Sequence, residues 1–369
     1  TVQNSFLSFG FSNAPSTVAT SADSAVGSII YNNNTHKNSD MTAAQQQYCI
    51  FSAKNIQIEG NNFEDITADN DTGKVISIEG GAENLSICSN SFYNCQGLDS
   101  TSTITHIHIA LGNVVEKHII NNNIITSGEN ATASVQNGIL FDSYRTAGSK
   151  YIDGYLTLVG NKITLYNGNF GILAKQDPSA SLTEAFEWYN LLCSDNEVTI
   201  FCSDKSNFDE YSNDASYSGA DFLNDSGAGI TGYVGGIDLR RLYSGTASGA
   251  GISSAQINGN TVYISDSSPP DTTGNQDFNG SVAIRVSKFS QNLNISNNNV
   301  VGGAIVAKWI YNTPDTVATE PKGGYYLKCS NNTVKCFSEG VNIEVNPATG
   351  YVSTISADQI AGSSAGNSR

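Results

Sequence analysis

Residues 56–63 read IQIEGNNF, and this arrangement returns along the chain. It combines an alternating apolar segment, a small or polar residue, an Asn, any residue and a further apolar residue. Clear copies are LSICSNSF (85–92), LTLVGNKI (156–163), AQINGNTV (255–262) and LNISNNNV (293–300), and weaker copies surround Asn123, Asn196 and Asn332. A phrase that recurs in this way is typical of a repeat architecture.

The Asn positions measure the length of the repeat. They fall at 61, 90, 123, 161, 196, 260, 298 and 332, which gives intervals of 29, 33, 38, 35, 64, 38 and 34 residues. A second alternating segment follows each phrase, as in KVISIE (74–79), ITHIHIAL (104–111) and GIDLR (236–240). Alternation of period two indicates half-buried strands. Two strands with their turns in each interval predict an all-β chain, a right-handed single-stranded parallel β-helix of about 8–11 coils with loop insertions.

The repeated Asn has a physical reason to recur. We expect it to occupy a sharp turn, because it tolerates the left-handed backbone conformation and its amide can bond to the amides of the coils above and below. Cys193 and Cys329 fall where Ile58 stands in its own copy. The sequence therefore predicts an Asn ladder beside a core in which some thiols replace larger apolar side chains.

The repeat covers nearly the whole chain, so we expect residues 1–369 to form one elongated domain. Two segments interrupt the rhythm, at residues 176–188 and 203–233, and insertions in a solenoid map to loops on one face, often the binding face. The opening residues TVQNSF resemble the end of a repeat phrase. From this we expect a fragment or processed form of a longer chain.

Composition narrows the class of protein. The chain has a net charge of −16 with only 18 Lys and Arg, and 14% of its residues are charged. A surface rich in Asn, Ser, Thr and Gly suits an extracellular or virion protein, whereas binding to nucleic acid requires clustered basic residues. No long apolar run predicts a membrane span, and neither the Cys nor the His residues have metal-ligand spacing, so we expect no cofactor and no metal.

The second strands carry the candidate site. If their alternate apolar residues face the core, two columns face solvent, one reading Glu79, His108, Asp142, Lys175, Arg240, Ser287, Lys308 and Glu344 in coil order. The parallel column reads Ser77, His106, Leu140, Leu173, Asp238, Arg285, Val306 and Asn342. Lys175, Arg240, Arg285 and Lys308 are candidate cations for an acidic glycan. The columns can also be a solvated ladder of opposite charges, which stabilises stacked strands weakly.

Acid–base chemistry has three candidate arrangements on these columns. Asp142 and Asp238, two coils apart, are spaced as the carboxylates of inverting glycosidases. Glu79 and Asp142 are the competing pair. His108, placed between them, can instead act as the base of a β-elimination, with Lys175 or Arg240 stabilising the enolate. Aromatic side chains in or beside the insertions and at a strand end are candidates to stack on sugar rings or to pack the loops: Trp188, Trp309, Tyr211 and Tyr217.

The Asn phrases, such as Asn161-Lys-Ile and Asn260-Thr-Val, resemble those of the right-handed parallel β-helix superfamily, which holds pectate-lyase-like enzymes, bacteriophage tailspikes and depolymerases, and bacterial adhesins. The catalytic phrases of polygalacturonases and pectate lyases are missing. The polar, Gly-rich character is most similar to a tailspike or receptor-binding depolymerase. That resemblance implies an extracellular homotrimer on a virion tail or cell surface that binds bacterial surface polysaccharide, as a hydrolase, a lyase or a binding protein. A non-catalytic adhesin or structural spike is the alternative.

Overall fold

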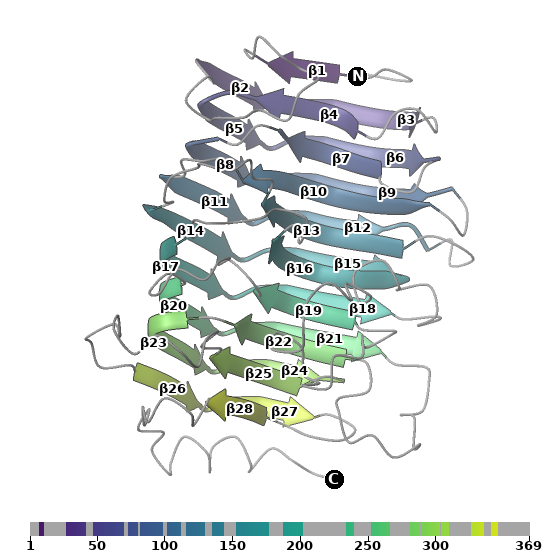
Figure 1. Ribbon diagram of the computed structural model, residues 1–369. Coiled ribbons are helices and arrows are strands. Elements are labelled where there is room, and N and C mark those ends of the chain that lie inside the picture. The colour runs from purple at the N-terminus through teal and green to yellow at the C-terminus, as the bar shows by residue number, and fades with distance from the viewer. Residues whose placement is uncertain are drawn as a thin grey trace.

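The computed structural model describes residues 7–10, 27–41, 47–69, 73–79, 82–98, 102–111, 116–129, 135–143, 153–176, 187–201, 234–239, 252–265, 281–287, 289–302, 304–309, 326–335 and 341–345. This part of the chain contains strands and turns and no helix. Its strands form three sheets, each wholly parallel and stacked in sequence order (Figure 1). The expected parallel β-helix is confirmed.

Each sheet takes one strand from successive coils and is named here by its first strand. The β1 sheet contains β1 (Leu7–Gly10), β4 (Gln47–Ser52), β7 (Gly73–Ile78), β10 (Thr103–Leu111), β13 (Val135–Ser143), β16 (Gly168–Gln176), β19 (Val234–Leu239), β22 (Ser281–Ser287), β25 (Ala304–Trp309) and β28 (Val341–Val345). The β2 sheet contains β2 (Ser28–Asn32), β5 (Asn55–Glu59), β8 (Asn84–Cys88), β11 (Lys117–Asn121), β14 (Asp153–Val159), β17 (Glu187–Ser194), β20 (Ile252–Asn258), β23 (Phe289–Ser296) and β26 (Tyr326–Ser330). The β3 sheet contains β3 (Thr35–Met41), β6 (Asn62–Ala68), β9 (Ser91–Gly97), β12 (Ile124–Ser127), β15 (Lys162–Tyr166), β18 (Glu197–Phe201), β21 (Thr261–Ser265), β24 (Asn299–Val301) and β27 (Thr333–Lys335).

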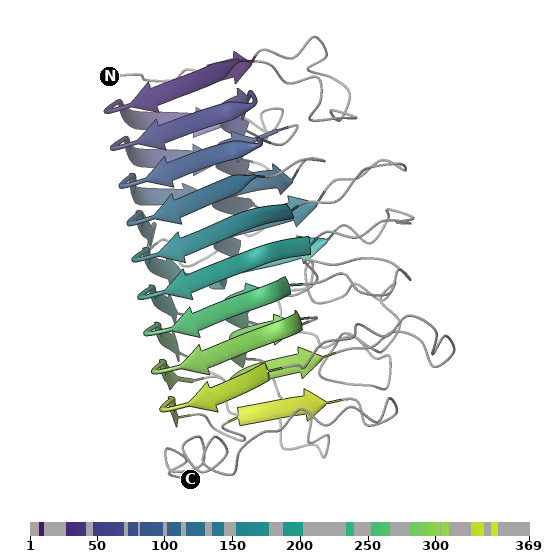
Figure 2. The same ribbon diagram turned by 90° about the vertical axis from the view of Figure 1, so that its left-hand side faces the viewer.

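A coil therefore contains three strands, and the expectation of two was wrong. The phrase IQIEGNNF spans two of them, because β5 ends at Glu59 and β6 begins at Asn62. The two residues between them, Gly60 and Asn61, turn the chain from the β2 sheet into the β3 sheet. The coils stack in chain order along the solenoid axis, from the N-terminus at the top of Figure 2 to the C-terminus at the bottom, so each side chain lies above its equivalent in the next coil.

The repeated Asn residues form the expected ladder at this turn. Each side-chain amide donates to the Oδ1 atom of the next Asn at 2.9–3.0 Å, from Asn61 through Asn332. Each amide also donates to a backbone carbonyl, as Asn161 Nδ2 does to Ile120 at 2.7 Å. The left-handed conformation belongs to the preceding residue, for example Gly160 (φ 66°) or Ser89 (φ 58°), and not to the ladder Asn as we had expected. That explains why the phrase requires a small or polar residue before the Asn.

The solenoid interior is one continuous apolar core. Ile58, Cys193 and Cys329 occupy the inner face of the β2 sheet and are buried, as predicted. The long interval between Asn196 and Asn260 adds no described strand, because β16 pairs directly with β19, β17 with β20 and β18 with β21. The insertions predicted at residues 176–188 and 203–233 lie mainly outside the described residues. The coil of β16, β17 and β18 pairs directly with the coil of β19, β20 and β21.

The alternation of the β1 sheet breaks at one position in several of its described strands. Val75 and Ile76 both belong to the core, as do Ala283 and Ile284 five strand steps further along the sheet in the same columns. In β10 the equivalent pair is His106 and Ile107. His106 therefore points inward, with its ring edge-to-face on Phe92 at 5.9 Å and its Nδ1 atom 2.7 Å from the Asn137 carbonyl oxygen. The prediction that His106 faces solvent was wrong, because a strict period of two was carried across this break.

Acidification tests the burial of this histidine. Burial lowers the pKa of His106 to about 4, and that of His118 also to about 4. The unfolded chain binds protons near pH 6.5 while the folded imidazole stays neutral, so stability is complete above that pH and falls as the pH drops toward 4. We expect each histidine to cost about 2 kcal/mol at pH 5. Denaturation midpoints of His106→Gln should fall less steeply between pH 7 and 5 than those of the wild type; equal slopes would contradict the prediction.

Candidate functional site

The strand register decides which predicted site residues share a column. Asp142 lies beside Lys175, and Lys308 beside Glu344, as the sequence predicted. His108 lies beside Ser77 and Leu140, not in the column of Glu79 and Asp142. The position between Glu79 and Asp142 belongs to Ala110, because Ile78 pairs with Ile109 and Ala110 pairs with Asp142. The predicted column was displaced by two residues at this coil, because it took the residues before Ile107 and Ile109 and not those after them.

For several candidate residues the structure describes the backbone and not the side chain. The strands that carry them are described, but their side chains lie outside the described part: Asp142, Lys175, Trp188, Ser287, Lys308 and Trp309. Arg240, Tyr211 and Tyr217 lie wholly outside the described residues. Asp142 and Asp238 stand on rungs two coils apart, as expected, because β13, β16 and β19 are consecutive in the sheet. They occupy different columns, because Asp238 pairs with Leu173, and Leu173 pairs with Leu140 and not with Asp142.

The parallel column is buried and does not face solvent as predicted. Its described members are at most 4% exposed: Ser77, His108, Leu140, Leu173, Asp238 and Arg285. Within it, Arg285 lies directly below Asp238. The guanidinium donates from Nε to Oδ1 at 2.9 Å and from Nη2 to Oδ2 at 2.6 Å. A buried carboxylate held by two such bonds is engaged by the protein itself, so neither a free catalytic Asp238 nor a free ligand-binding Arg285 fits this geometry.

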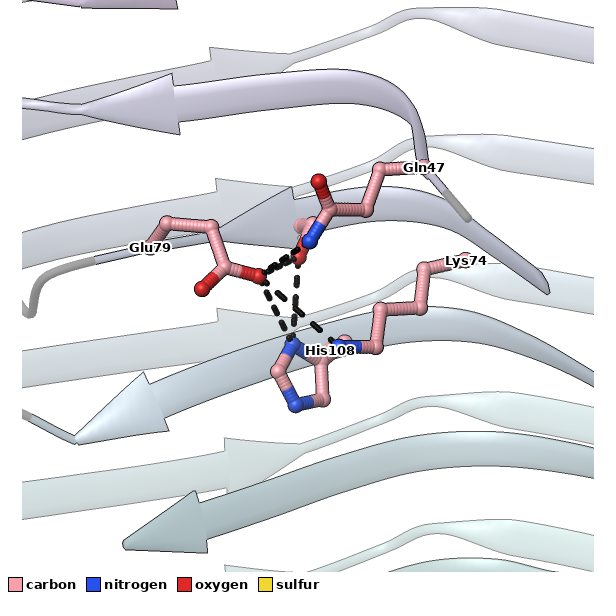
Figure 3. A network of polar contacts seen from close by, with 5 residues as sticks. Gln47, Lys74, Glu79 and His108 are labelled. Carbon is pink, nitrogen blue, oxygen red and sulfur yellow. Dashed lines mark hydrogen bonds and ion pairs between the residues drawn. The ribbon is translucent and has the colours of Figure 1, made fainter. Parts of the chain in front are cut away.

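The structure does bring Glu79 and His108 together, with three further residues of β4 and β7. Glu79 follows β7, and its side chain is about a third exposed at 36%. Its Oε1 atom accepts hydrogen bonds from the Ser77 hydroxyl at 2.5 Å and from Gln47 Nε2 at 2.7 Å. Lys74 Nζ lies 3.8 Å from the same oxygen and His108 Nδ1 3.7 Å (Figure 3). We call these five residues the Glu79 cluster.

The hydrogen bonds of the Glu79 cluster form a short relay. Ser77 has one hydroxyl hydrogen, which it donates to Glu79. The 3.1 Å contact between Ser77 Oγ and His108 Nδ1 therefore has the imidazole as its donor, which places the proton on Nδ1. The relay runs from a buried imidazole through a buried hydroxyl to a partly exposed carboxylate. Such a chain can pass a proton between the interior and the surface.

The carboxylate of Glu79 is also oriented. All four contacts reach Oε1, whereas Oε2 accepts no hydrogen bond from a described residue and points away from the other labelled side chains (Figure 3). A fixed carboxylate with one open oxygen at the surface can accept a hydrogen bond from a ligand hydroxyl. Preorganisation of this kind reduces the entropy lost on binding.

Sequence reasoning found Glu79 and His108 but missed the residues that orient them. Gln47 and Lys74 are partners in neighbouring strands, and Ser77 stands two residues before Glu79. The three polar side chains converge because they project from adjacent rungs around one carboxylate. Lys74, Ser77 and Glu79 are the polar residues of the segment KVISIE (74–79) and could have been grouped from the sequence, whereas β4, which carries Gln47, has no clear Asn phrase beside it.

Comparison with known proteins adds no assignment: no protein-family model, no curated protein and no solved structure matches this chain. Within the described part of the chain, no helix is long and apolar enough to cross a membrane.

Proposed function

We propose that this protein is an extracellular spike, on a virion or a cell surface, that binds bacterial surface polysaccharide. The observation that carries the proposal is the oriented, partly exposed carboxylate of Glu79 on a long stack of parallel strands. A polysaccharide presents many hydroxyl groups along an extended chain, and the open Oε2 atom is a suitable acceptor for one of them. The resemblance to β-helix spikes supports the same class of ligand.

Removing the charge of Glu79 tests this proposal. We expect Glu79→Gln to weaken binding of purified bacterial surface polysaccharide by about 10-fold or more, because a hydrogen bond to a charged group contributes roughly 1.5–3 kcal/mol. Isothermal titration calorimetry or affinity electrophoresis measures the change. Glu59→Gln is a matched control, since Glu59 is a half-buried glutamate on the β2 sheet that also accepts a serine hydroxyl, from Ser86 at 2.9 Å. Equal binding by both variants and the wild type would contradict the proposed site.

Cleavage of the polysaccharide is a second candidate function, favoured by the relay from His108 through Ser77 to Glu79. General acid–base catalysis needs a group that can exchange a proton at the substrate, and Glu79 is the exposed end of this relay. Incubation with the polysaccharide should then release oligosaccharides, and Glu79→Gln should abolish the release. If the wild type binds without releasing products, the protein is an adhesin or a non-catalytic spike.

The burial of Asp238 against Arg285 favours the non-catalytic alternative, because it removes one carboxylate of the predicted hydrolytic pair. The homotrimer implied by the resemblance stays a prediction. Sedimentation equilibrium of the chain gives its mass directly, and a monomer would count against a trimer built by this segment alone.

A further inference from the structure

The outer face of the β3 sheet carries a group of aromatic residues that is separate from the Glu79 cluster. Four aromatic side chains lie on it, from β9, β15, β18 and β21: Tyr93, Tyr166, Phe201 and Tyr263. Tyr93 is 57% exposed, Tyr263 41% and Phe201 37%. Large side chains of this kind are normally covered, so their grouping on one face requires an explanation. We call these four residues the aromatic platform.

Three of the four rings of the aromatic platform are ordered against one another. Tyr166 and Phe201 are partners in adjacent strands, with ring centroids 5.1 Å apart and planes inclined by 14°. Phe201 meets Tyr263 edge-on at 6.2 Å. Mutual stacking fixes the ring orientations before any ligand arrives, which lowers the entropic cost of binding on them.

Hydroxyl groups and one carboxylate accompany the rings. Thr126, Thr164 and Thr199 are successive partners in the sheet, with Tyr93 beside one end of this row and Tyr263 beside the other. Glu129 hydrogen-bonds to Tyr166; burial first, and then the charge of Glu129, raises the pKa of that tyrosine. The surface is therefore not simply apolar. It alternates ring faces with groups that donate and accept hydrogen bonds.

The charge of this face distinguishes between classes of ligand. In β9, β12, β15, β18 and β21, Lys162 is the only basic residue, and its Nζ atom lies 3.2 Å from Glu197. Glu129 is exposed and adds negative charge. Within the described residues of these five strands no cation is left to pair with a polyanion, so the negative charge of Glu129 and Glu197 disfavours one. A flat apolar protein surface would cover Glu129 and the threonine hydroxyls without satisfying them, which is costly.

The platform is long and straight. Tyr93 and Tyr263 are four strand steps apart in the β3 sheet, β9–β12–β15–β18–β21 (Figure 1). At about 4.8 Å per step they are ~19 Å apart along the solenoid axis. We infer that this face binds an uncharged, linear glycan, with sugar rings on the aromatic platform and sugar hydroxyls on the threonine row and Glu129. The inference rests on the proposed polysaccharide function and locates a second contact surface, separate from the Glu79 cluster.

The test uses the full chain with purified neutral linear glucans, galactans and mannans, and with uronate-containing and sulfated polymers as acidic probes. Affinity electrophoresis should show retardation of the wild type by at least one neutral polymer. The double variant Phe201→Ala/Tyr263→Ala should bind it about 10-fold or more weakly, because each ring contributes stacking as well as covered area. Tyr155→Ala, which removes a 50% exposed tyrosine from the β2 sheet, should bind as the wild type does. Matching thermal unfolding curves show that the fold is kept.

The outcomes separate this inference from the proposed Glu79 site. Loss of binding in Glu79→Gln with full binding in Phe201→Ala/Tyr263→Ala overturns the platform and keeps the Glu79 site, and the reverse result does the opposite. Binding of acidic polymers alone overturns the neutral glycan. If the double variant instead turns an oligomer into a smaller species in sedimentation, the platform is a contact between copies of this chain, which also overturns the inference. Binding to no polymer by the wild type overturns both.

Discussion

Replacing Arg285 by Met should destabilise the protein by about 4 kcal/mol, because it leaves the Asp238 carboxylate buried without its counter-ion. Asp238 is fully buried and Arg285 is 2% exposed, and two hydrogen bonds join them. The loss is a large fraction of the 5–15 kcal/mol that ordinarily holds a folded chain together. The free energy of unfolding, from urea denaturation followed by circular dichroism, measures it.

The double variant Asp238→Leu/Arg285→Met should recover most of that stability. The two rungs above carry Leu140 and Leu173 in the same column, so a leucine at position 238 extends an existing apolar column. Exchange of a buried ion pair for apolar residues of similar volume is often neutral or stabilising. The double-mutant cycle with the two single variants gives the coupling energy of the pair.

An exposed ion pair provides the control for this prediction. Lys162 and Glu197 are 3.2 Å apart, and both side chains are more than half exposed. We expect Lys162→Met to change stability by less than about 1 kcal/mol. A similarly small effect of Arg285→Met would mean that water reaches Asp238 in solution. That outcome would return Asp238 to the set of carboxylates that can act on a ligand.

The fold was predictable because the information that specifies it is local and repeated. Each copy of the phrase places apolar residues in phase, a left-handed residue before the Asn and the Asn itself at the turn. The third strand was missed because the turn at Gly60 and Asn61 is only two residues long, so β5 and β6 read as one segment. A short turn of this kind leaves no interruption in the apolar pattern.

The site was predicted less well, because its geometry depends on features that alternation does not report. At His106 and Ile107 two consecutive side chains are buried, which a strict alternation does not predict. Ser77, His108 and Asp238 lie on the outward column and are nevertheless buried, and a period of two does not reveal whether an outer face is covered. The Glu79 cluster and the aromatic platform also depend on contacts between rungs. Those contacts follow from the register of neighbouring strands. The positions of the repeated Asn predict this register only for the coils that have a clear copy of the phrase.

The isosteric change Asn161→Asp should cost about 4 kcal/mol or more at pH 7. Asn161 Nδ2 donates to the Ile120 carbonyl at 2.7 Å and to Asn196 Oδ1 at 3.0 Å, while its Oδ1 atom accepts from the backbone and side-chain nitrogens of Asn123. Aspartate keeps the shape and the acceptor but replaces the donor with an oxygen that faces two other oxygens. It also buries a charge, and both changes are strongly unfavourable.

The pH dependence distinguishes the loss of the donor from a general loss of packing. A protonated aspartate has one O–H and can restore one of the two donated bonds, so the gap in unfolding free energy between Asn161→Asp and the wild type should narrow as the pH falls from 7 toward 4. Asn299→Asp, the same substitution at an exposed position of β24, should change stability by less than about 0.5 kcal/mol. A gap for Asn161→Asp that stays constant with pH would show that the ladder acts by filling space. In that case the recurrence of Asn along the chain would reflect the turn and not the amide hydrogen bonds that join its coils.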